Sequence, residues 1–278
     1  NKTAAGQLRD RMLRVPEYGK AFLSPQEAYL HADSRTLLVV VDTNRPDQVE
    51  NRNLLEACTR VAVIDHHRRA ATYIPNATMS FHEPYASSAC ELMTELLEEL
   101  VEQPDILRVE AEAMLSGIML DTKDFTVRTG ERTFEAAAFL RRNGADVVRV
   151  RKLFRDRLED YRARAEAIQK AEIYHGAFAI SVCPSEGLES PTVVGAQAAN
   201  ELLDIVGIKA SFILTQMGDT IYFSARSIDE INVQIIMERL GGGGHRTIAG
   251  AQLKGATIDE AREKLKDLIT DMMEKGEI

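Results

Sequence analysis

Two short runs of consecutive apolar residues occur early in the chain, at residues 37–41 and 61–64. Both runs are apolar at every position rather than at alternate positions, which is typical of strands buried on both faces of a parallel sheet. Longer helical patterns separate these runs and continue to about residue 120. This alternation predicts a parallel sheet with crossover helices, in which both runs are central strands.

The helices of this first part have recognisable ends. Ser88 and Glu91 have the spacing of a capping box, and the apolar stripe that follows reaches about residue 101. A second helix is expected after Pro104, and its apolar positions lead to Asp121, beyond which helical periodicity stops. We therefore expect Asp121 at the end of a helix or in the loop that follows.

The rest of the chain mixes strand and helix patterns. A long pattern at 147–171 is rich in Arg and Glu and has few apolar residues, which favours a helical connector between domains. Gly218-Asp219 lies between two strand-like runs and is a hairpin signal. The elements expected after the connector are strands at 177–182, 211–215 and 220–225, and helices at 196–206, 232–240 and beyond Thr257.

These patterns predict an α/β fold of two domains. Residues 1–172 would form a domain with a parallel sheet and include the connector helix, and residues 173–278 would form a smaller mixed α/β domain. A chain of 278 residues is long enough for two cores. Its longest apolar stretches are about five residues, far short of the roughly 20 that span a bilayer. The chain opens with neither Met nor a leader, so Asn1 is not expected to be the natural start.

Charge and cysteine content exclude some classes of protein. The 34 basic residues against 43 acidic ones give a net charge of −9, which argues against a protein that coats duplex nucleic acid. Any nucleotide would have to be bound locally. Cys58, Cys90 and Cys183 are odd in number and widely spaced, so neither a disulfide framework nor a zinc site is expected, and a reducing cytoplasm fits best.

Acids and imidazoles follow the apolar runs. Asp42 ends the first run, and Asp65, His66 and His67 end the second. Ligands of open α/β sheets bind at this edge of the sheet, and a cluster of carboxylates and imidazoles without thiolates suits Mn²⁺ or a similar ion. Asp121 is a further candidate. An isolated Asp after a strand is more often a turn or helix cap, but a triplet after a buried strand is harder to explain that way.

A second candidate site lies near the carboxyl end of the chain. Residues 241–244 are four consecutive glycines, followed by His245. One glycine would suffice to end a helix, so we favour a loop whose N–H groups face a phosphate over a simple terminator. Arg226, at the end of the expected hairpin, could pair with a phosphate, although an exposed Arg is common there. Arg128 is a weaker phosphate-contact candidate.

Together these motifs resemble one family. The chain is similar along almost its whole length to the DHH phosphoesterase superfamily with its DHH-associated nucleotide-binding domain, and most similar to the GdpP-type branch. The branch is indicated by Arg-Thr-Gly at 128–130 and Ser-Ala-Arg-Ser at 224–227. The motifs that carry the resemblance are Val-Val-Val-Asp-Thr at 39–43, Val-Ile-Asp-His-His-Arg-Arg at 63–69, Glu-Pro-Tyr-Ala-Ser-Ser at 83–88, Leu-Asp-Thr-Lys-Asp-Phe at 120–125 and Gly-Gly-Gly-Gly-His at 241–245.

The resemblance implies a role for each candidate. Asp42 would bridge two Mn²⁺ ions, with His66 and Asp121 as further ligands. Asp65 and His67 would be catalytic, His67 lying near the scissile phosphate. The residues implied to bind substrate are Arg128, Arg226, Gly241, Gly242, Gly243, Gly244 and His245. The family's first motif, His-x-x-x-Asp-x-Asp, has no match in this sequence and would lie upstream of Asn1.

The resemblance also implies an activity, which is hydrolysis of cyclic di-AMP to linear pApA. Two alternatives stay open: an oligoribonuclease or pApA hydrolase of the same superfamily, and a cyclic-dinucleotide sensor without turnover. A homodimer is expected. Members of the branch are membrane-anchored bacterial proteins, so this chain would be a cytoplasmic-facing part whose membrane contact comes only from upstream segments.

Overall fold

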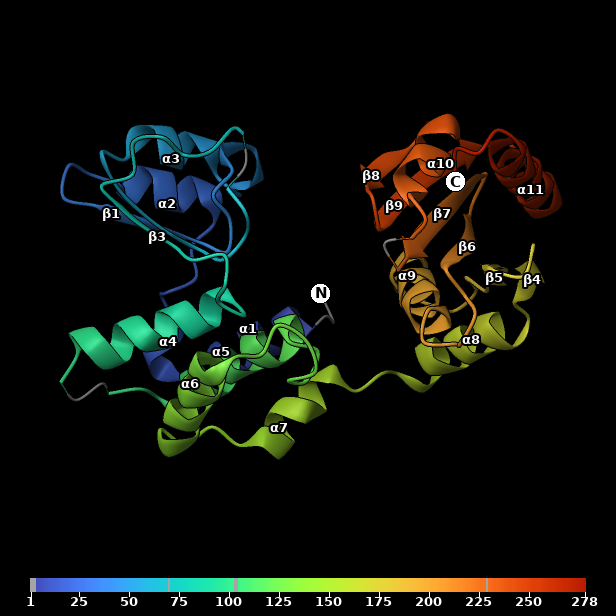
Figure 1. The fold of residues 1–278 in the computed structure, drawn as a ribbon. Helices are drawn as coiled ribbons and strands as arrows, with labels where there is room; N and C mark the ends of the chain where they lie inside the picture. Colours follow the sequence, from blue (N-terminus) through green and yellow to red (C-terminus); the bar gives the residue numbers. More distant parts are fainter. Residues whose placement is uncertain (1–3, 70, 103–104, 229) are drawn as a thin grey trace. The chain divides into compact units, whose positions relative to one another are not determined.

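The computed structural model describes residues 4–69, 71–102, 105–228 and 230–278, and it divides into two compact units, Asn1–Arg155 and Asp156–Ile278. Figure 1 draws the course of the chain through both units. The division falls earlier than the expected boundary near residue 172. Among the described residues, no helix has both the length and the apolar character that a membrane span requires.

The first unit contains a parallel sheet of three strands in the order β1-β2-β3. These are β1 (Leu37–Val41), β2 (Arg60–Asp65) and β3 (Met79–His82). The other elements of this unit are α1 (Ala4–Met12), η1 (Pro16–Tyr18), α2 (Pro25–His31), η2 (Pro46–Gln48), α3 (Arg52–Ala57), α4 (Ala89–Leu100), α5 (Arg108–Asp121), α6 (Glu131–Arg142), α7 (Val147–Arg151) and η3 (Lys152–Phe154).

The central strand β2 is buried on both faces, as its apolar run predicts. Val61 and Val63 pack with Leu54 and Leu55 of α3, while Ile64 packs with Leu92 of α4. Within the described residues the expectation of a second central strand is not met, because β1 pairs with β2 alone. Its Leu37, Val39 and Val41 side chains are 57%, 45% and 50% exposed. A continuous apolar run therefore marked β-structure correctly but not the strand's place in the sheet.

Helices α4, α5 and α6 pack together below this sheet (Figure 1). Leu115 and Ile118 of α5 are buried against Phe139 and Leu140 of α6. Asp121 is the last residue of α5, as expected. At the start of α4, the Ser88 hydroxyl accepts a hydrogen bond from the Glu91 N–H, but the Glu91 carboxylate accepts from Ser87 instead of closing a capping box. The expected start of α5 after Pro104 lies outside the described residues.

The second unit has one sheet of six strands in the order β4-β5-β6-β7-β9-β8, in which only β5 and β6 are parallel. The expected hairpin is present as β6 and β7, joined at Gly218-Asp219. Helices α10 and α11 pack on one face of the sheet, and α8 and α9 pack on the other. The elements are α8 (Leu158–Gln169), β4 (Glu172–Tyr174), β5 (Phe178–Cys183), α9 (Pro191–Leu202), β6 (Ala210–Met217), β7 (Thr220–Ser227), α10 (Val233–Arg239), β8 (Gly243–His245), β9 (Ile248–Lys254) and α11 (Ile258–Glu274).

The expected connector helix at 147–171 is not continuous. It consists of α7, η3 and α8, and residues 155–157 between them are not helical. Ala163 and Ala167 of α8 are buried among residues of α9 and β5, so α8 belongs to the second unit. Small alanine contacts leave little trace in an apolar pattern, and no Gly or Pro in this stretch signals the break.

Candidate functional site

The parallel pairing of β1 and β2 brings the first acidic residues together. Val41 is in register with Ile64, and the Asp42 N–H donates to the Ile64 carbonyl oxygen at 3.0 Å. Asp42 has φ 62°, a left-handed conformation that Asp tolerates better than most residues. The chain therefore turns directly after β1, and the Asp42 carboxylate lies beside the residues that end β2.

His66 is the centre of this cluster. Its ring is almost fully buried, and its Nε2 lies 3.3 Å from Asp42 Oδ1 and 3.6 Å from Asp121 Oδ2. The other ring nitrogen, Nδ1, lies 3.4 Å from the Ala86 carbonyl oxygen. With a proton on Nδ1 that carbonyl is satisfied, and Nε2 can offer its lone pair to a cation bound beside the two carboxylates; without a cation, a proton on Nε2 can donate to Asp42. Histidines that bind metals commonly have this arrangement.

The two contacts of His66 Nε2 have the spacing of ligands that share a divalent cation. Ligands held about 2.1 Å from one ion lie roughly 3.0–3.5 Å from one another. The two distances from His66 Nε2 are close to that range. Carboxylate and imidazole ligands without thiolates favour ions such as Mn²⁺ over a structural zinc ion. The structure thus brings together Asp42, His66 and Asp121, the three residues expected to bind metal.

Asp65 and His67 form a separate pair next to this cluster. Asp65 is fully buried and accepts hydrogen bonds from His67 Nδ1 at 2.8 Å and from the His67 N–H at 3.2 Å. His67 Nδ1 also lies 3.9 Å from Asp42 Oδ1, and Asp42, His66 and His67 are the residues whose ligand atoms all lie within 4.8 Å of one another in the described part of the chain. Because Nδ1 already donates to Asp65, we favour Asp121 over His67 as the third ligand.

The pKa shifts match this division. Burial opposes ionisation of Asp65, but hydrogen bonds from His67 and Asn44 outweigh it and lower the pKa of Asp65. Burial and the nearby Asp42 carboxylate raise the pKa of Asp121. The hydrogen bond to Asp42 raises the pKa of His66. Two carboxylates close together around one imidazole repel each other, and a bound cation would relieve that repulsion.

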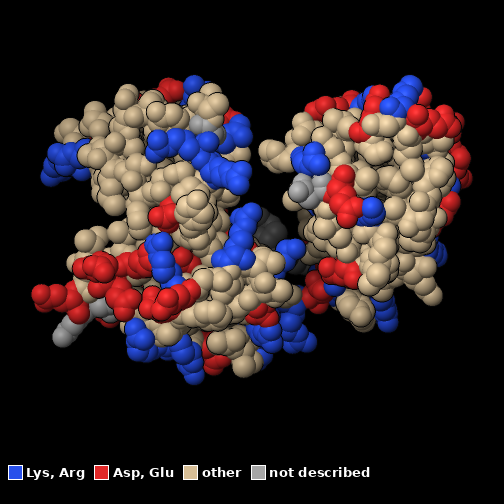
Figure 2. All heavy atoms as spheres, viewed as in Figure 1, with Lys and Arg blue, Asp and Glu red and all other residues tan. Residues whose placement is uncertain are grey.

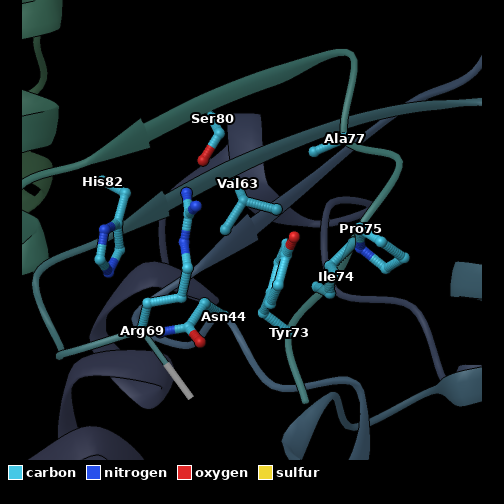
Figure 3. Close-up of a pocket in the computed structure, with 9 residues that line it drawn as sticks. All are labelled: Asn44, Val63, Arg69, Tyr73, Ile74, Pro75, Ala77, Ser80 and His82. Carbon is cyan, nitrogen blue, oxygen red and sulfur yellow. The ribbon is translucent and has the colours of Figure 1, made fainter. Parts of the chain in front are cut away.

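Two residues that the sequence did not indicate complete the surroundings of the pair. The buried Asn44 side chain donates to Asp65 Oδ2 at 2.5 Å, and His82 Nε2 lies 2.5 Å from the His67 carbonyl oxygen. Both residues line a cavity of about 190 Å³, in which Arg69 and Tyr73 lie next to each other (Figure 3). An Asn two residues after a candidate ligand is too common a pattern to be noticed without the fold.

Of the expected substrate-binding residues, only Arg128 belongs to the first unit. It is exposed, has φ 51°, and its charge acts to lower the pKa of Asp121. Arg128 is therefore close enough to the carboxylate cluster to influence it. Acidic side chains gather over α4 on the face shown in Figure 2, so the surface of this unit has no uniform positive charge there.

The glycine run lies in the second unit and is not a simple loop. Gly243 and Gly244 belong to the edge strand β8, and Gly241 follows α10 with φ 81°. A Cβ on Gly242 would lie 2.1 Å from the Gly250 carbonyl oxygen, and one on Gly244 would lie 2.5 Å from Ala249 Cα. A Cβ on Gly243 would meet nothing within 4 Å. Close packing of β8 against β9 therefore explains two of the four glycines, and it does not explain Gly243.

Arg226 lies on β7 in the same sheet. Its Nε donates to Asn200 Oδ1 of α9 at 3.1 Å, and its Nη1 donates to the Ala225 carbonyl oxygen at 2.9 Å. Arg226 and His245 are both in register with Ile248 of β9. Burial lowers the pKa of Arg226, and the structure gives it no carboxylate partner among the described residues. A partly buried guanidinium without an acid is a suitable partner for a phosphate.

Comparison with known families assigns both units. The DHH family N-terminal domain matches residues 7–118, and the DHHA1 domain matches residues 177–271. The chain therefore carries a DHH domain followed by a DHHA1 domain.

Two curated relatives are similar over almost the whole chain. The cyclic-di-AMP phosphodiesterase PdeA of Listeria monocytogenes is 43% identical over 272 residues, which is 98% of this chain and 41% of that protein. The cyclic-di-AMP phosphodiesterase GdpP of Bacillus subtilis is 44% identical over 265 residues, which is 95% of this chain and 40% of that protein. The chain thus spans about two fifths of the length of these relatives.

Solved structures support the fold. An exopolyphosphatase-related protein from Bacteroides fragilis superposes with a TM-score of 0.73 at 19% identity, covering 93% of this chain and 75% of that chain. RecJ from Thermus thermophilus in complex with Mn²⁺ superposes with a TM-score of 0.53 at 17% identity, covering 96% of this chain and 50% of that chain. The DHH fold expected from the motifs is confirmed.

Proposed function

We propose that this chain is the catalytic part of a metal-dependent phosphodiesterase that hydrolyses cyclic di-AMP to linear pApA. The observation that carries the proposal is the convergence of Asp42, His66 and Asp121, which come from two strand ends and a helix end. The two curated relatives described above are named for this activity and are 43% and 44% identical over 98% and 95% of this chain.

The residues of the cluster have separate tasks in this proposal. Asp42, His66 and Asp121 hold a divalent ion through Oδ1, Nε2 and Oδ2. When bound, such an ion supplies Lewis-acid stabilisation of the charge that develops on a phosphate group. Asp65 holds His67 through Nδ1–H, which leaves the Nε2 lone pair of His67 free to accept a proton and then to pass that proton to a phosphate oxygen. Asn44 keeps Asp65 in place from the other side.

We propose two Mn²⁺ ions for the full-length protein. Three protein ligands suit one ion, and a second ion would need further ligands. Among the described residues, one edge of β1 is unpaired, and this edge lies beside Asp42. Another strand that pairs there could supply the further ligands. With only one ion well held, this chain alone would hydrolyse slowly, and extending it upstream would restore Mn²⁺-dependent cleavage by several orders of magnitude.

The second unit would bind the nucleotide. Arg226 and His245 offer groups to a phosphate, and Gly243 lets a ligand approach the backbone. Arg128 of the first unit would contact a phosphate near the metal ligands. We also propose a homodimer and membrane attachment through other segments of the full-length protein. Sedimentation of the purified chain tests the first of these, and fractionation of cells that express the full-length protein tests the second.

Product analysis tests the proposed activity. An upstream-extended chain is incubated with cyclic di-AMP, cyclic di-GMP and pApA in the presence of Mn²⁺, and the products are separated by chromatography. Accumulation of pApA supports the proposal, and conversion of pApA to AMP would favour the oligoribonuclease alternative. Asp42→Asn should abolish turnover, and Asp10→Asn, an exposed carboxylate of α1, should not. Binding without any turnover by the extended chain would favour the sensor.

A further inference from the structure

One part of the second sheet is left open by its helices. On the face that carries Arg226, α8 packs against β5 and α9 packs against β5, β6 and β7, while β9 and β8 continue to the edge of the sheet (Figure 1). A cavity of about 330 Å³ lies on this open part, a size within the range of small-molecule sites. Its lining includes Thr192, Tyr222, Ser224, Gly242, Gly250 and Gln252.

The register of the strands arranges these residues in rows. Directly opposed residues of neighbouring strands project to the same face of a sheet. The first row is Arg226, Ile248 and His245, the second is Ser224, Gly250 and Gly243, and the third is Tyr222 and Gln252. Successive rows on one face are about 7 Å apart. The middle row therefore contains one small side chain and two glycines between two rows of large ones.

The middle row forms the floor of a trough: Ser224 and Gly250 line the cavity, and Gly243 lies next to Gly250 on the edge strand, outside the cavity lining. Because Gly250 and Gly243 have no side chains, a flat ring can lie directly on the backbone of β9 and β8. Packing does not require glycine at position 243, since a Cβ there would meet nothing within 4 Å. A ligand that lies on this floor would require it.

The third row offers groups that recognise a base. Within the described part of the chain, neither the Tyr222 hydroxyl nor the exposed Gln252 amide makes a hydrogen bond. An aromatic ring can stack on any base. A Gln amide presents a donor and an acceptor side by side, which matches N7 and the N6 amino group of adenine, whereas the O6 and N7 acceptors of guanine call for Arg or Lys.

We infer that Tyr222, Gln252 and the glycine floor form an adenine-binding subsite, in which the base lies on Gly250 and Gly243 and the Gln252 amide distinguishes adenine from guanine. This inference rests on the proposed function and adds to it the residues that recognise the base. Arg226 lies on β7, as Tyr222 does, but two rows away from it. Its guanidinium takes a phosphate of the same nucleotide.

Binding of pApA and pGpG to the full 278-residue chain tests the subsite. Dissociation constants are measured by calorimetry, without turnover, for wild type, Gln252→Ala and Gln252→Arg. We expect wild type to prefer pApA. Gln252→Ala should weaken pApA binding by about fivefold to a hundredfold, the range for a lost bidentate base contact, and should change pGpG binding much less. Gln252→Arg should reverse the preference in favour of pGpG.

Matched variants separate this effect from general damage. Gln216 of β6 is in register with Ile221, which is buried on the α10 side, so its exposed amide projects to the face opposite the subsite. Gln216→Ala should therefore change neither dissociation constant. Tyr222→Phe should keep pApA affinity, and Tyr222→Leu should lose it through lost stacking. If wild type binds no nucleotide, both the subsite and the proposed function fail. If wild type binds pApA but both Gln252 variants keep its ratio of pApA to pGpG affinity, only the subsite fails.

Discussion

The glycine run provides a quantitative test, because neighbouring glycines are predicted to differ in their effect on stability. A Cβ at Gly242 would lie 2.1 Å from the Gly250 carbonyl oxygen and 2.6 Å from Ala251 Cα. Ordinary contacts of a Cβ are 3.4 Å or more, so β8 would have to move away from β9 by about 1 Å. Overpacking of this kind costs typically 1–3 kcal/mol, and loss of the short ladder would add to it. At Gly243 the same Cβ meets nothing, so Ala there should be neutral or stabilise slightly.

Differential scanning calorimetry measures the thermal unfolding of wild type, Gly242→Ala and Gly243→Ala. For a unit of this size, the expected cost should lower the Tm of the Gly242→Ala variant by roughly 5–15 °C. Gly243→Ala should unfold within about 2 °C of wild type and should weaken pApA binding, since its methyl group would occupy the trough floor. Equal stability of Gly242→Ala and wild type, or equal destabilisation of both variants, would refute the division of the run into packing and ligand positions.

Three further predictions concern other parts of the chain. Gly117→Ala should destabilise the first unit by about 1–3 kcal/mol in urea unfolding, because the added Cβ would lie 2.3 Å from Cys90 Sγ. Adding Cys90→Ala to this variant should restore most of the lost stability. A double variant that is no more stable than Gly117→Ala would contradict the contact. Burial and a hydrogen bond to Glu110 raise the pKa of Tyr18 to about 12, so its stabilising contribution is complete below pH 10 and is lost as the pH rises towards 12. The urea midpoints of wild type and Tyr18→Phe should therefore converge between pH 10 and pH 12. A difference that stays constant over this range would contradict the stabilising role of the Tyr18 hydroxyl. Arg226→Ala should weaken pApA binding by about 1.5–3 kcal/mol in calorimetry and leave Mn²⁺ affinity unchanged, and a loss of both would indicate misfolding instead.

The sequence predicted those features that depend on local patterns. The buried run at 61–64 placed Asp65, His66 and His67 at a strand end, and the helical periodicity before Asp121 placed that residue at a helix end. The hairpin around Gly218-Asp219 and the cap at Thr257 were also correct.

Features that depend on tertiary contacts could not be predicted. Nothing in the composition of residues 147–171 marks the non-helical residues 155–157, and an apolar run does not tell an edge strand from a central one. Asn44 and His82 act only through partners that the fold brings near. The packing reason for Gly242 and Gly244 depends on the register of β8 and β9, which a run of glycines does not specify.

The central claim is that Asp42, His66 and Asp121 bind one divalent cation. Anomalous diffraction at the manganese absorption edge from crystals soaked in Mn²⁺ tests it most directly, because millimolar Mn²⁺ would reveal even a weak site. We expect a peak about 2.1 Å from Asp42 Oδ1, His66 Nε2 and Asp121 Oδ2, with His67 Nδ1 still hydrogen-bonded to Asp65. A peak that Asp121 does not contact, or the absence of any peak at this cluster, would contradict it.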